Sequence, residues 1–555
     1  MKCAIDGFAI RRFVVFCVGA AFVIGAGGFM VPSDSDYFFK INKSIDVFGR
    51  VYKETAANYV DEVDPERFMQ AGIDGLLGTL DPYTVYIDKE EGDEVDLLTH
   101  GKYGGIGVTI GRRGKVIQVL TVMDGYSAQR QGVLPGDAIL EIDGIPVGKK
   151  LDKVRTLTRG EPGTEVKVLI EREGEPSPIE FVLIREEIKL RNVTYSDYVD
   201  DGIAYIRLER FSRRGGEEVR QAIKELKLNG QLKGLVLDLR GNPGGLLDAA
   251  VDVVSKFIPK GSVIVSTKGR RSTADKQYLS AEEPLVPEVP MVVLTDRSSA
   301  SASEIVAGSL QDLDRALIVG TRTFGKGLVQ TILPLNYGAQ LKITTARYYT
   351  PSGRSIQEID YMGTDSNGVF ATVPDSLKRE FKTANGRTVY EYGGITPDST
   401  VEEKDLGPMV RELYRKSLFF KFSNKYAAKH VDSSYTRLTE ESLGAFRMFL
   451  AEENFDYQEE SAERVNELKQ IAMKSHYGDQ ILKDLDLLAS ALANEKGRGF
   501  ERYKDHIRHE LNVVLRERIA GEKGKIEASL QDDVQLETAV GMLKDLKVYE
   551  RKIKP

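Results

Sequence analysis

The chain has 555 residues, of which 77 are Lys or Arg and 84 are Asp or Glu, giving a formal net charge of −7. This length predicts about three or four domains of roughly 150 residues each. With 41% hydrophobic and 29% charged residues, the chain can bury sizeable cores, which excludes a disordered, collagen-like or polytopic membrane protein. The mildly acidic balance provides no field that attracts nucleic acid, so we expect no nucleic-acid partner.

The first part of the chain contains a nearly apolar run, residues 13–31, which follows Arg11 and Arg12. About 19 residues are enough to span a bilayer, and the two arginines predict that the span starts in the cytoplasm. We interpret residues 1–33 as an uncleaved anchor in the inner membrane. A cleaved signal peptide, processed in the small-residue stretch 25–28, is the main alternative, and a buried core helix is a third. Both export interpretations place the rest of the chain on the periplasmic side of the cell envelope.

The spacing of apolar residues divides the remainder into four regions. Residues 34–98 carry apolar positions at helical spacing and predict a helical lead-in. Residues 99–188 contain strand-length runs separated by glycine and proline turns, which predicts a compact β-rich module. In residues 189–400 strands alternate with helices, a pattern typical of βαβ units around a largely parallel sheet with sites at the carboxyl ends of its strands. Residues 401–555 predict long charged helices with one apolar face each, which pack on the core or contact partners.

Histidines are missing from the alternating region, although the commonest hydrolytic triad needs one as its base. His100 lies just before the first strand of the β-rich module, and the other four lie in the helical tail, at His430, His476, His506 and His509. A Ser–His–Asp triad is therefore disfavoured. His506 and His509, which are three positions apart in the helical tail, have no evident third ligand, so we predict no metal site.

The segment 298–304, SSASASE, follows the predicted strand 291–294 and opens a helix. A serine in this place has a simple structural explanation, because it can cap the helix. The same position also suits a nucleophile, because the free amides and the positive end of the helix dipole can stabilise an oxyanion.

The segment 320–327, GTRTFGKG, nearly matches a phosphate-binding P-loop. However, Gly327 stands where a P-loop needs Ser or Thr, and residues 328–335 predict a strand where a P-loop needs a helix. A nucleotide site is therefore disfavoured. A lysine flanked by apolar residues can instead be desolvated, which lowers its pKa until the neutral amine acts as a base. The alternative is an ordinary surface lysine on a hairpin.

A third segment, residues 238–245, has the sequence DLRGNPGG and lies at the end of a predicted strand. Such a turn is either a tight connection or a loop that points backbone N–H groups into a site. Taken together, the segments resemble the carboxy-terminal processing peptidases, or tail-specific proteases, which are serine peptidases with a serine–lysine dyad. The resemblance covers roughly residues 40–400, and its four ordered motifs are 238–245, 299–308, 323–330 and 393–398.

This resemblance implies a catalytic role for three side chains. Ser301 would be the nucleophile, Lys326 the general base, and Gln330 the residue that positions the lysine amine. A neutral lysine can take the serine proton, so the set is chemically coherent. The oxyanion would be held by two backbone amides, those of Ala302 and of either Gly244 or Gly245. Acyl-enzyme chemistry requires no cofactor and no metal, and none is predicted.

The β-rich module resembles the PDZ domain of the same family, which is inserted between the lead-in and a crotonase-like ββα core. Its carboxylate-binding loop would be formed by five consecutive residues, Tyr103, Gly104, Gly105, Ile106 and Gly107. Successive backbone amides in such a loop capture a chain terminus, while the strand edge beside it pairs with the peptide. One departure is Gln131, which stands where the family has a small alanine. The resemblance further implies that apolar C-terminal residues are the signal.

The sequence therefore predicts a multidomain α/β protein, an exported and membrane-anchored serine endopeptidase that cleaves envelope or periplasmic proteins near their C-termini. Its partners would be protein or peptide substrates with apolar C-termini, the inner membrane, and an adaptor or a second copy bound by the helical tail. A non-catalytic PDZ scaffold with a decayed peptidase core is the main alternative, although the serine, lysine and glutamine are all present. An ATP-driven envelope motor is a further one, which depends on the near P-loop.

Overall fold

The computed structural model describes residues 34–89, 101–114, 116–364, 370–372, 374, 376, 378–430 and 438–554. The chain forms two compact units, residues 1–86 and 87–555, which are described separately. Within the described residues, no helix is long and apolar enough to cross a membrane. The predicted anchor at residues 13–31 lies outside them, as does His100.

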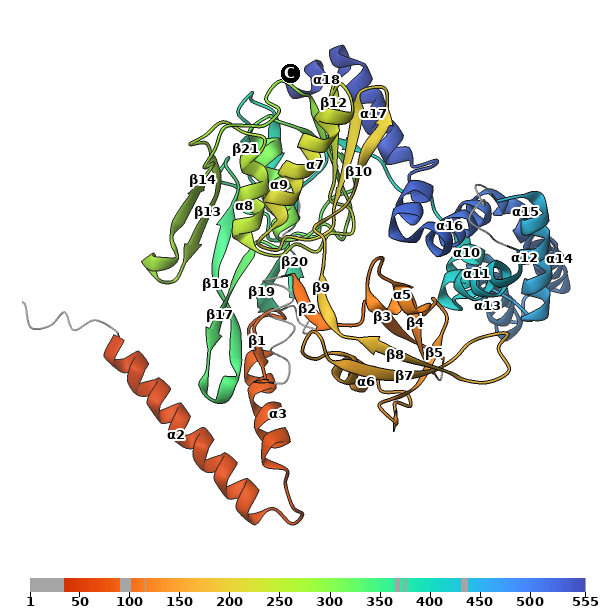
Figure 1. The fold of residues 1–555 in the computed structure, drawn as a ribbon, viewed down its shortest axis with the longest axis horizontal. Helices are drawn as coiled ribbons and strands as arrows, with labels where there is room; N and C mark the ends of the chain where they lie inside the picture. The colour runs from red at the N-terminus through yellow and green to blue at the C-terminus, as the bar shows by residue number, and fades with distance from the viewer. Residues whose placement is uncertain are drawn as a thin grey trace, which may run out of the picture. The chain divides into compact units, whose positions relative to one another are not determined.

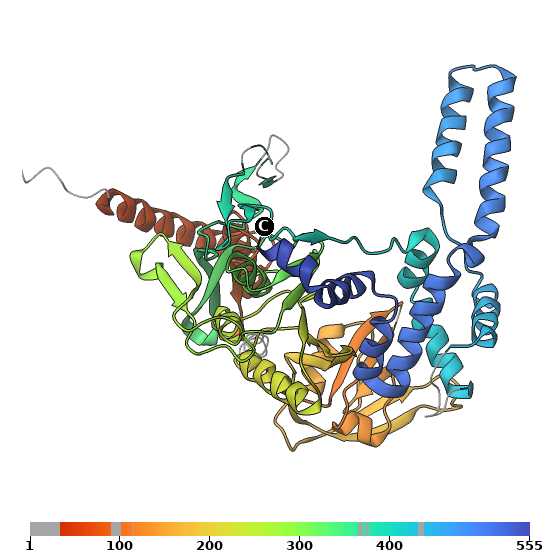
Figure 2. The ribbon, with the colours of Figure 1, turned by 90° about the horizontal axis from the view of Figure 1, so that it is seen from above.

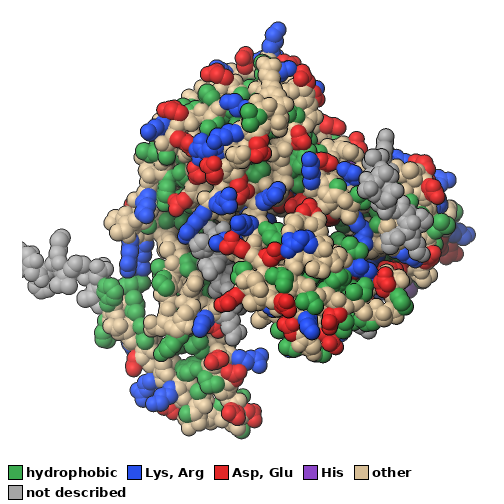
Figure 3. Space-filling model, viewed as in Figure 1, with side chains coloured by type: hydrophobic (Ala, Val, Ile, Leu, Met, Phe, Trp, Pro, Cys, Tyr) green, Lys and Arg blue, Asp and Glu red, His purple; other side chains and the backbone are tan. Residues whose placement is uncertain are grey.

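The first unit consists of α2 (Asp34–Asn58) and α3 (Pro65–Leu77), and β1 (Val85–Ile87) begins at its end. Helix α3 starts sharply because Asp64 caps its first amides and Pro65 occupies a position where no N–H is needed. Helix α2 exposes seven large apolar side chains: Tyr37, Phe38, Phe39, Ile45, Val47, Phe48 and Val51. Figure 3 shows hydrophobic side chains among charged ones in this part of the chain.

In the second unit, the β-rich module is an antiparallel sheet in the order β3-β4-β5-β7-β8, with β6 paired to β5. Its elements are β3 (Val108–Arg113), β4 (Val116–Val122), α5 (Ser127–Gln131), β5 (Ala138–Ile142), β6 (Ile145–Pro146), α6 (Leu151–Thr158), β7 (Glu165–Glu171) and β8 (Ile179–Ile184). Strand β7 alternates, with Val166, Val168 and Ile170 buried between exposed or half-buried residues, as a sheet with one covered face requires. Strands β2 (Lys102–Gly105) and β9 (Glu186–Lys189) form a separate antiparallel pair.

The central sheet of the core has the order β10-β11-β12-β15-β16-β23. All its neighbouring strands are parallel except β10 and β11. Its strands are β10 (Val193–Asp200), β11 (Ile203–Leu208), β12 (Gly234–Asp238), β15 (Met291–Thr295), β16 (Leu317–Gly320) and β23 (Ser399–Thr400). Every residue of β12, β15 and β16 is buried, because helices cover both faces of the sheet.

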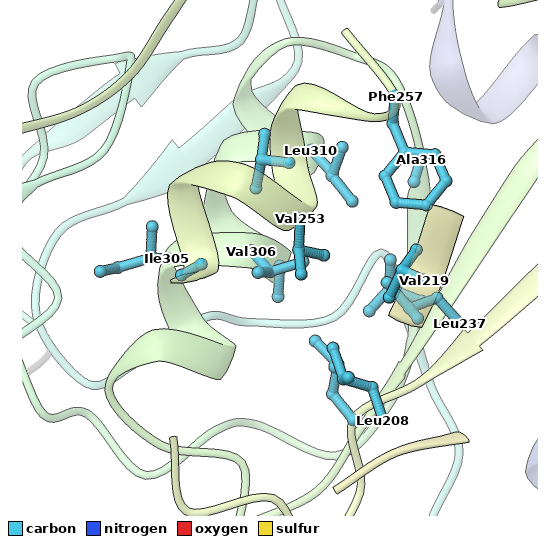
Figure 4. Close-up of a cluster of buried hydrophobic side chains, with 14 of the residues drawn as sticks. Leu208, Val219, Leu237, Val253, Phe257, Ile305, Val306, Leu310 and Ala316 are labelled. Carbon is cyan, nitrogen blue, oxygen red and sulfur yellow. The ribbon is translucent and has the colours of Figure 1, made fainter. Parts of the chain in front are cut away.

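One face of the sheet packs against α7 (Gly215–Asn229), α8 (Leu247–Ser255) and α9 (Ala302–Asp312). Figure 4 shows side chains of α8 and α9, such as Val253 and Leu310, directed toward the same core as Leu208 and Leu237 of the sheet.

The other face packs against α17 (Val534–Lys544) and α18 (Leu546–Ile553), which Figure 1 shows beside β12 and β10. Their apolar side chains lie on strand residues such as Val236 and Val292. Tyr549 adds a polar anchor, since its hydroxyl lies 3.0 Å from the carbonyl oxygen and 3.1 Å from the amide nitrogen of Met291. The last two helices of the predicted helical tail are therefore part of the peptidase-like core.

Smaller antiparallel pairs complete the core. Strands β17 (Leu328–Pro334) and β18 (Gln340–Tyr349) form a hairpin through a short turn at Asn336–Gly338, and β18 also pairs with β13 (Val263–Gly269), which pairs with β14 (Lys276–Leu279). The remaining pairs are β19 (Ile359–Thr364) with β20 (Phe370–Thr372), and β21 (Glu380–Lys382) with β22 (Thr388–Tyr390).

The other tail helices form two further apolar clusters, and in the larger one Phe419 and Phe446 stack with ring centroids 5.5 Å apart. They are α10 (Gly407–Arg415), α11 (Leu418–His430), α12 (Glu440–Glu452), α13 (Glu460–Lys474), α14 (Asp479–Gly497), α15 (Gly499–Arg502) and α16 (Lys504–Ser529). Helices α13 and α14 pack on each other as a long pair, which Figure 2 shows extending beyond the other tail helices. Helix α16 is interrupted at Ala520 and Gly521, and Gly521 has a φ of 61°.

Replacing Leu543 with alanine should lower the free energy of unfolding by about 2–5 kcal/mol, because it removes a buried side chain of α17 from the sheet face. Leu546, at the start of α18, is the matched control: its side chain is 51% exposed, against 4% for Leu543, and its alanine variant should lose less than about 1 kcal/mol. Urea unfolding of the full chain measures both. Equal losses would mean that α17 does not cover the core.

Candidate active site

The predicted nucleophile, Ser301, is the N-cap residue of α9, where the chain leaves the carboxyl end of β15. Its backbone has φ 55° and ψ −111°, a conformation that is costly for a residue with a Cβ and that persists only where the surroundings impose it. Ser301 is half-buried. A strained, half-buried serine at a helix start is compatible with a nucleophile, and Ser301 also forms a capping box with Glu304.

The buried carboxylate of Glu304 joins the serine segment to the lysine segment. One of its oxygens, Oε2, accepts the backbone N–H groups of both Ser301 and Lys326, each at 2.8 Å. The other, Oε1, accepts the Thr323 hydroxyl at 2.6 Å and the Gly325 N–H at 2.7 Å. Because the first two nitrogens share one acceptor atom, the structure brings the backbones of Ser301 and Lys326 together.

No role was assigned to Glu304 from the sequence. It stands three residues after a serine at a predicted helix start, and this spacing is that of a capping box. Its N–H acceptance from Ser301 fits that local pattern, but its bonds to the lysine segment connect residues 19 to 22 positions apart. The spacing therefore indicates a helix-capping role for Glu304, whereas only the fold shows that Glu304 connects the serine segment to the lysine segment.

Tyr348 of β18 forms a second link between the same two segments. Its buried hydroxyl lies 2.6 Å from the carbonyl oxygen of Lys326 and 3.1 Å from that of Ser301. Burial raises the pKa of Tyr348 well above its usual value, so the hydroxyl keeps its single proton and shares it between these two carbonyl oxygens, the Lys326 oxygen being the nearer. The serine and the lysine are thus tied through their N–H groups by Glu304 and through their carbonyls by Tyr348.

Lys326 lies in the loop between β16 and β17 and is half-buried, between the buried residues Gly325 and Gly327. Gly325 has a φ of 88°, and a Cβ on it would lie 2.6 Å from the Cβ of Glu358, so this position requires glycine. Residues 328–334 form β17, whereas a P-loop requires a helix after its lysine. The local structure therefore argues against the nucleotide-binding alternative.

Gln330 lies on β17, half-buried, opposite Thr344 of β18. Its amide nitrogen donates to the Thr344 hydroxyl at 3.2 Å, which fixes the orientation of the amide. Its role in positioning the lysine amine stays a prediction.

Two backbone amides near Ser301 are without an acceptor among the described residues. Of the first four amides of α9, three donate to carbonyl groups and that of Ala302 does not. In the glycine turn, the Gly244 N–H donates to Oδ1 of Asn242 at 2.9 Å, whereas the Gly245 N–H has no acceptor in the described part of the chain. Of the two glycines named from the sequence, Gly245 is therefore the one whose amide is available.

The glycine turn lies directly against the serine segment. A Cβ on Gly244, which has a φ of 104°, would lie 2.7 Å from the Ala300 carbonyl and 3.0 Å from the Cβ of Ser301. Asn242 holds the two segments together, because its backbone carbonyl accepts the Ala300 N–H at 3.1 Å and the Ser303 hydroxyl at 2.8 Å.

The turn begins at Asp238, the last residue of β12, which is completely buried. Oδ2 accepts the Tyr205 hydroxyl at 2.6 Å, and both oxygens accept from the Arg240 guanidinium at 2.6 to 3.0 Å. Burial alone would raise the pKa of Asp238, but the charge and hydrogen bonds of Arg240 outweigh it and hold the pKa below its usual value. Asp238 is therefore an ionised anchor for the start of the turn.

The predicted carboxylate-binding loop runs from β2 to the start of β3. Tyr103, Gly104 and Gly105 lie in β2, paired with β9, and Ile106 is buried. Gly107 has a φ of 81°, and a Cβ on it would lie 2.5 Å from the Cβ of Tyr126. Within the described residues, the N–H groups of Ile106 and Gly107 have no acceptor. The loop therefore presents two successive amides beside β3, which is an edge strand of its sheet.

A strained serine whose backbone is linked to that of a lysine, on a largely parallel α/β core with a β-rich module, is the arrangement expected of a serine-type peptidase. Comparison with known proteins places it more closely. Sequence models match in four places: Peptidase family S41 at residues 202–366, the PDZ domain at 118–172, the probable PDZ-protease C-terminal helical domain at 409–543, and the activating protease CtpB N-terminal domain at 32–91.

Among curated relatives, the carboxy-terminal-processing protease of Bartonella bacilliformis is 38% identical over 358 residues, which is 63% of this chain and 81% of that protein. CtpB of Bacillus subtilis is 32% identical over 332 residues, which is 59% of this chain and 68% of CtpB. The chain belongs to the carboxy-terminal processing proteases of peptidase family S41. A solved photosystem II D1 C-terminal processing protease is 28% identical, with 64% of this chain and 86% of that chain covered and a TM-score of 0.36.

These comparisons confirm the family and the PDZ domain that the sequence motifs predicted. The family models also match the N-terminal region, at residues 32–91, and most of the helical tail, at residues 409–543.

Glu304 should make the stability of the protein depend on pH. Burial raises its pKa from 4.5 to about 7, although the hydroxyl of Thr323 and the three amides lower it. The folded protein therefore holds this proton more tightly than the unfolded chain does. The resulting stabilisation, on the order of 3 kcal/mol, is complete below about pH 4.5 and is lost as the pH rises to about 7.

Urea unfolding between pH 4.5 and pH 8 tests this expectation. The stability difference between the parent chain and Glu304→Gln should fall by that amount across the range, because glutamine has no proton to lose. Thr323→Val removes one hydrogen bond that lowers the pKa of Glu304. In this variant the stabilisation should therefore be lost at a higher pH than in the parent chain. A difference that is constant with pH would contradict the raised pKa.

Proposed function

We propose that this protein is an endopeptidase that cleaves envelope or periplasmic proteins near their C-termini, with Ser301 as nucleophile and Lys326 as general base. The observation that carries the proposal is the double link between their backbones, by the Glu304 carboxylate and the Tyr348 hydroxyl. Such links hold the two backbones next to each other, which supports a geometry in which their side chains can exchange a proton.

In the proposed reaction, the neutral amine of Lys326 takes the hydroxyl proton of Ser301 while Oγ attacks the carbonyl carbon of the scissile peptide bond. The negative charge that develops on the carbonyl oxygen is held by the amides of Ala302 and Gly245. Collapse of this intermediate breaks the C–N bond, and Lys326 returns the proton to the leaving amine. A water molecule then hydrolyses the acyl-enzyme, again with Lys326 as base, and Gln330 orients the lysine amine.

The PDZ domain would select substrates by their C-terminal residues. An extended peptide can pair with the free edge of β3, and the amides of Ile106 and Gly107 can bind its carboxylate. The half-buried side chains of Val108, Ile110 and Leu157 along β3 and α6 provide apolar surface for the last side chain. These features support recognition of apolar C-termini.

Three finer features belong to the same proposal. The core would follow the crotonase-like ββα arrangement of the family. Residues 13–31 would anchor the chain in the inner membrane, with the described residues on the periplasmic side. The N-terminal and C-terminal helical regions would bind an adaptor or a second copy of the chain.

The dyad is tested by cleavage of a denatured protein by the purified full chain. Ser301→Ala and Lys326→Ala should each reduce the rate at least about a thousandfold without lowering the unfolding temperature. Ser298→Ala and Lys276→Ala, which change exposed residues near the site and on β14, should keep the parent rate.

Full activity of Ser301→Ala would exclude the proposed mechanism. A parent chain that binds C-terminal peptides but cleaves nothing would favour the scaffold alternative.

Recognition of the C-terminus is tested with peptides that differ only in their last residues. A peptide ending in apolar residues should have a kcat/KM about tenfold higher than the same peptide ending in aspartates or in a C-terminal amide, because these lack the apolar contact or the carboxylate. Cleavage assays with equal peptide concentrations measure the ratio. Equal rates for all three peptides would show that the PDZ domain does not select the tail.

A further inference from the structure

The N-terminus of α17, nearly 300 residues away in the chain, contacts the glycine turn of the site. The two terminal nitrogens of Arg240 each donate to Asp533, at 2.7 and 3.1 Å, and one of them also donates to Oε1 of Gln535 at 3.0 Å. The ion pair is largely buried, with 14% of the Arg240 side chain and 11% of the Asp533 side chain exposed. A paired, buried guanidinium–carboxylate contact of this kind fixes geometry as well as charge.

On its other side, the same guanidinium holds Asp238 at the start of the turn. Arg240 therefore lies between two carboxylates, one on the central sheet and one on α17. Burial alone would lower the pKa of Arg240, but Asp238 and Asp533 together raise it above its usual value. Without Asp533, the guanidinium would keep Asp238 and Gln535 but lose the carboxylate that holds both of its terminal nitrogens on the α17 side.

The orientation of Arg240 affects the site because the turn that contains Arg240 is hydrogen-bonded to the serine segment. The Leu239 carbonyl accepts the Ser299 hydroxyl at 2.8 Å, and Asn242 binds the Ala300 N–H and the Ser303 hydroxyl. A shift of the turn would therefore move both the serine segment and the Gly245 amide. Displacements of about 1 Å in such a site can cost on the order of a hundredfold in rate.

Asp533 is not needed merely to dock α17. The helix is held on the sheet by apolar side chains, among them Leu536, Ala539 and Leu543, and at its other end by an ion pair between Lys544 and Asp200. Asp533 has a local role as well, because its Oδ1 accepts the amides of Gln535 and Leu536 at 3.0 Å and caps the helix. Capping and the contact to Arg240 can be separated, since asparagine and serine also cap helices but carry no charge.

We propose that Asp533 and Gln535 are positioning residues of the peptidase site, acting through Arg240 on the glycine turn that supplies the Gly245 amide. This inference rests on the proposed function. It makes the end of the helical tail a part of the catalytic apparatus, in addition to its packing on the core.

The test compares Asp533→Asn and Asp533→Ser with the parent full chain, and Lys544→Met is the matched control that removes the other ion pair of the same helix. Both Asp533 variants should lower kcat on the order of tenfold with KM within about twofold. A peptide aldehyde, whose adduct with the serine carries the oxyanion, should bind more weakly by the same factor. Lys544→Met should keep the parent kcat.

A double variant gives a second, independent measurement. If Asp533 acts through Arg240, Arg240→Lys combined with Asp533→Asn should be no slower than Arg240→Lys alone. Unchanged kcat in both Asp533 variants, an equal loss in Lys544→Met, or a loss confined to KM would each overturn the inference. Activity that survives Ser301→Ala would instead show that the proposed function itself has failed, so the two failures are distinguishable.

Discussion

The site depends on one buried carboxylate, that of Glu304, which faces donors from two loops. The loops follow β15 and β16, which are neighbouring parallel strands and therefore end at the same edge of the sheet. The pairing of β15 with β16 brings the two loops close, but it does not by itself determine which residues of the loops lie next to each other. The four hydrogen bonds to Glu304 define how the serine loop and the lysine loop meet, and the Tyr348 hydroxyl repeats the connection on the carbonyl side.

Much of this could be predicted from the sequence. Ser301, Lys326 and the glycine turn were named because each lies in a motif that follows a strand, and motifs in a fixed order identify the family. The parallel sheet followed from the alternation of strands and helices. The sequence leaves Gly244 and Gly245 open as the oxyanion glycine, because the difference between their amides depends on the Asn242 side chain, whose Oδ1 accepts the Gly244 N–H.

Other residues carried no usable signal. Tyr348 is an ordinary aromatic residue in a strand, and its two acceptors lie 22 and 47 positions away. Asp533 has the local pattern of a helix cap, and its partner Arg240 is 293 positions away. The apolar face of an amphipathic helix shows that it packs on something, not what it packs on. For this reason the tail is predicted as one helical domain, whereas in the structure α10–α12 and α16 share a core, α13 and α14 pack on each other, and α17 and α18 cover the sheet.

The place of α17 and α18 has a consequence for the order in which the protein becomes active during synthesis. A ribosome that has passed Gln330 has already made every predicted catalytic side chain, yet the sheet face covered by α17 and α18 is still open to water. Such a nascent chain also lacks the partner of Arg240 on α17. Domains fold as units once their sequence is complete, so this core closes only when residues 534–553 have been made. A protease built in this way gains its stable active form only after α17 and α18, which lie more than 200 residues beyond its predicted catalytic side chains, have been translated.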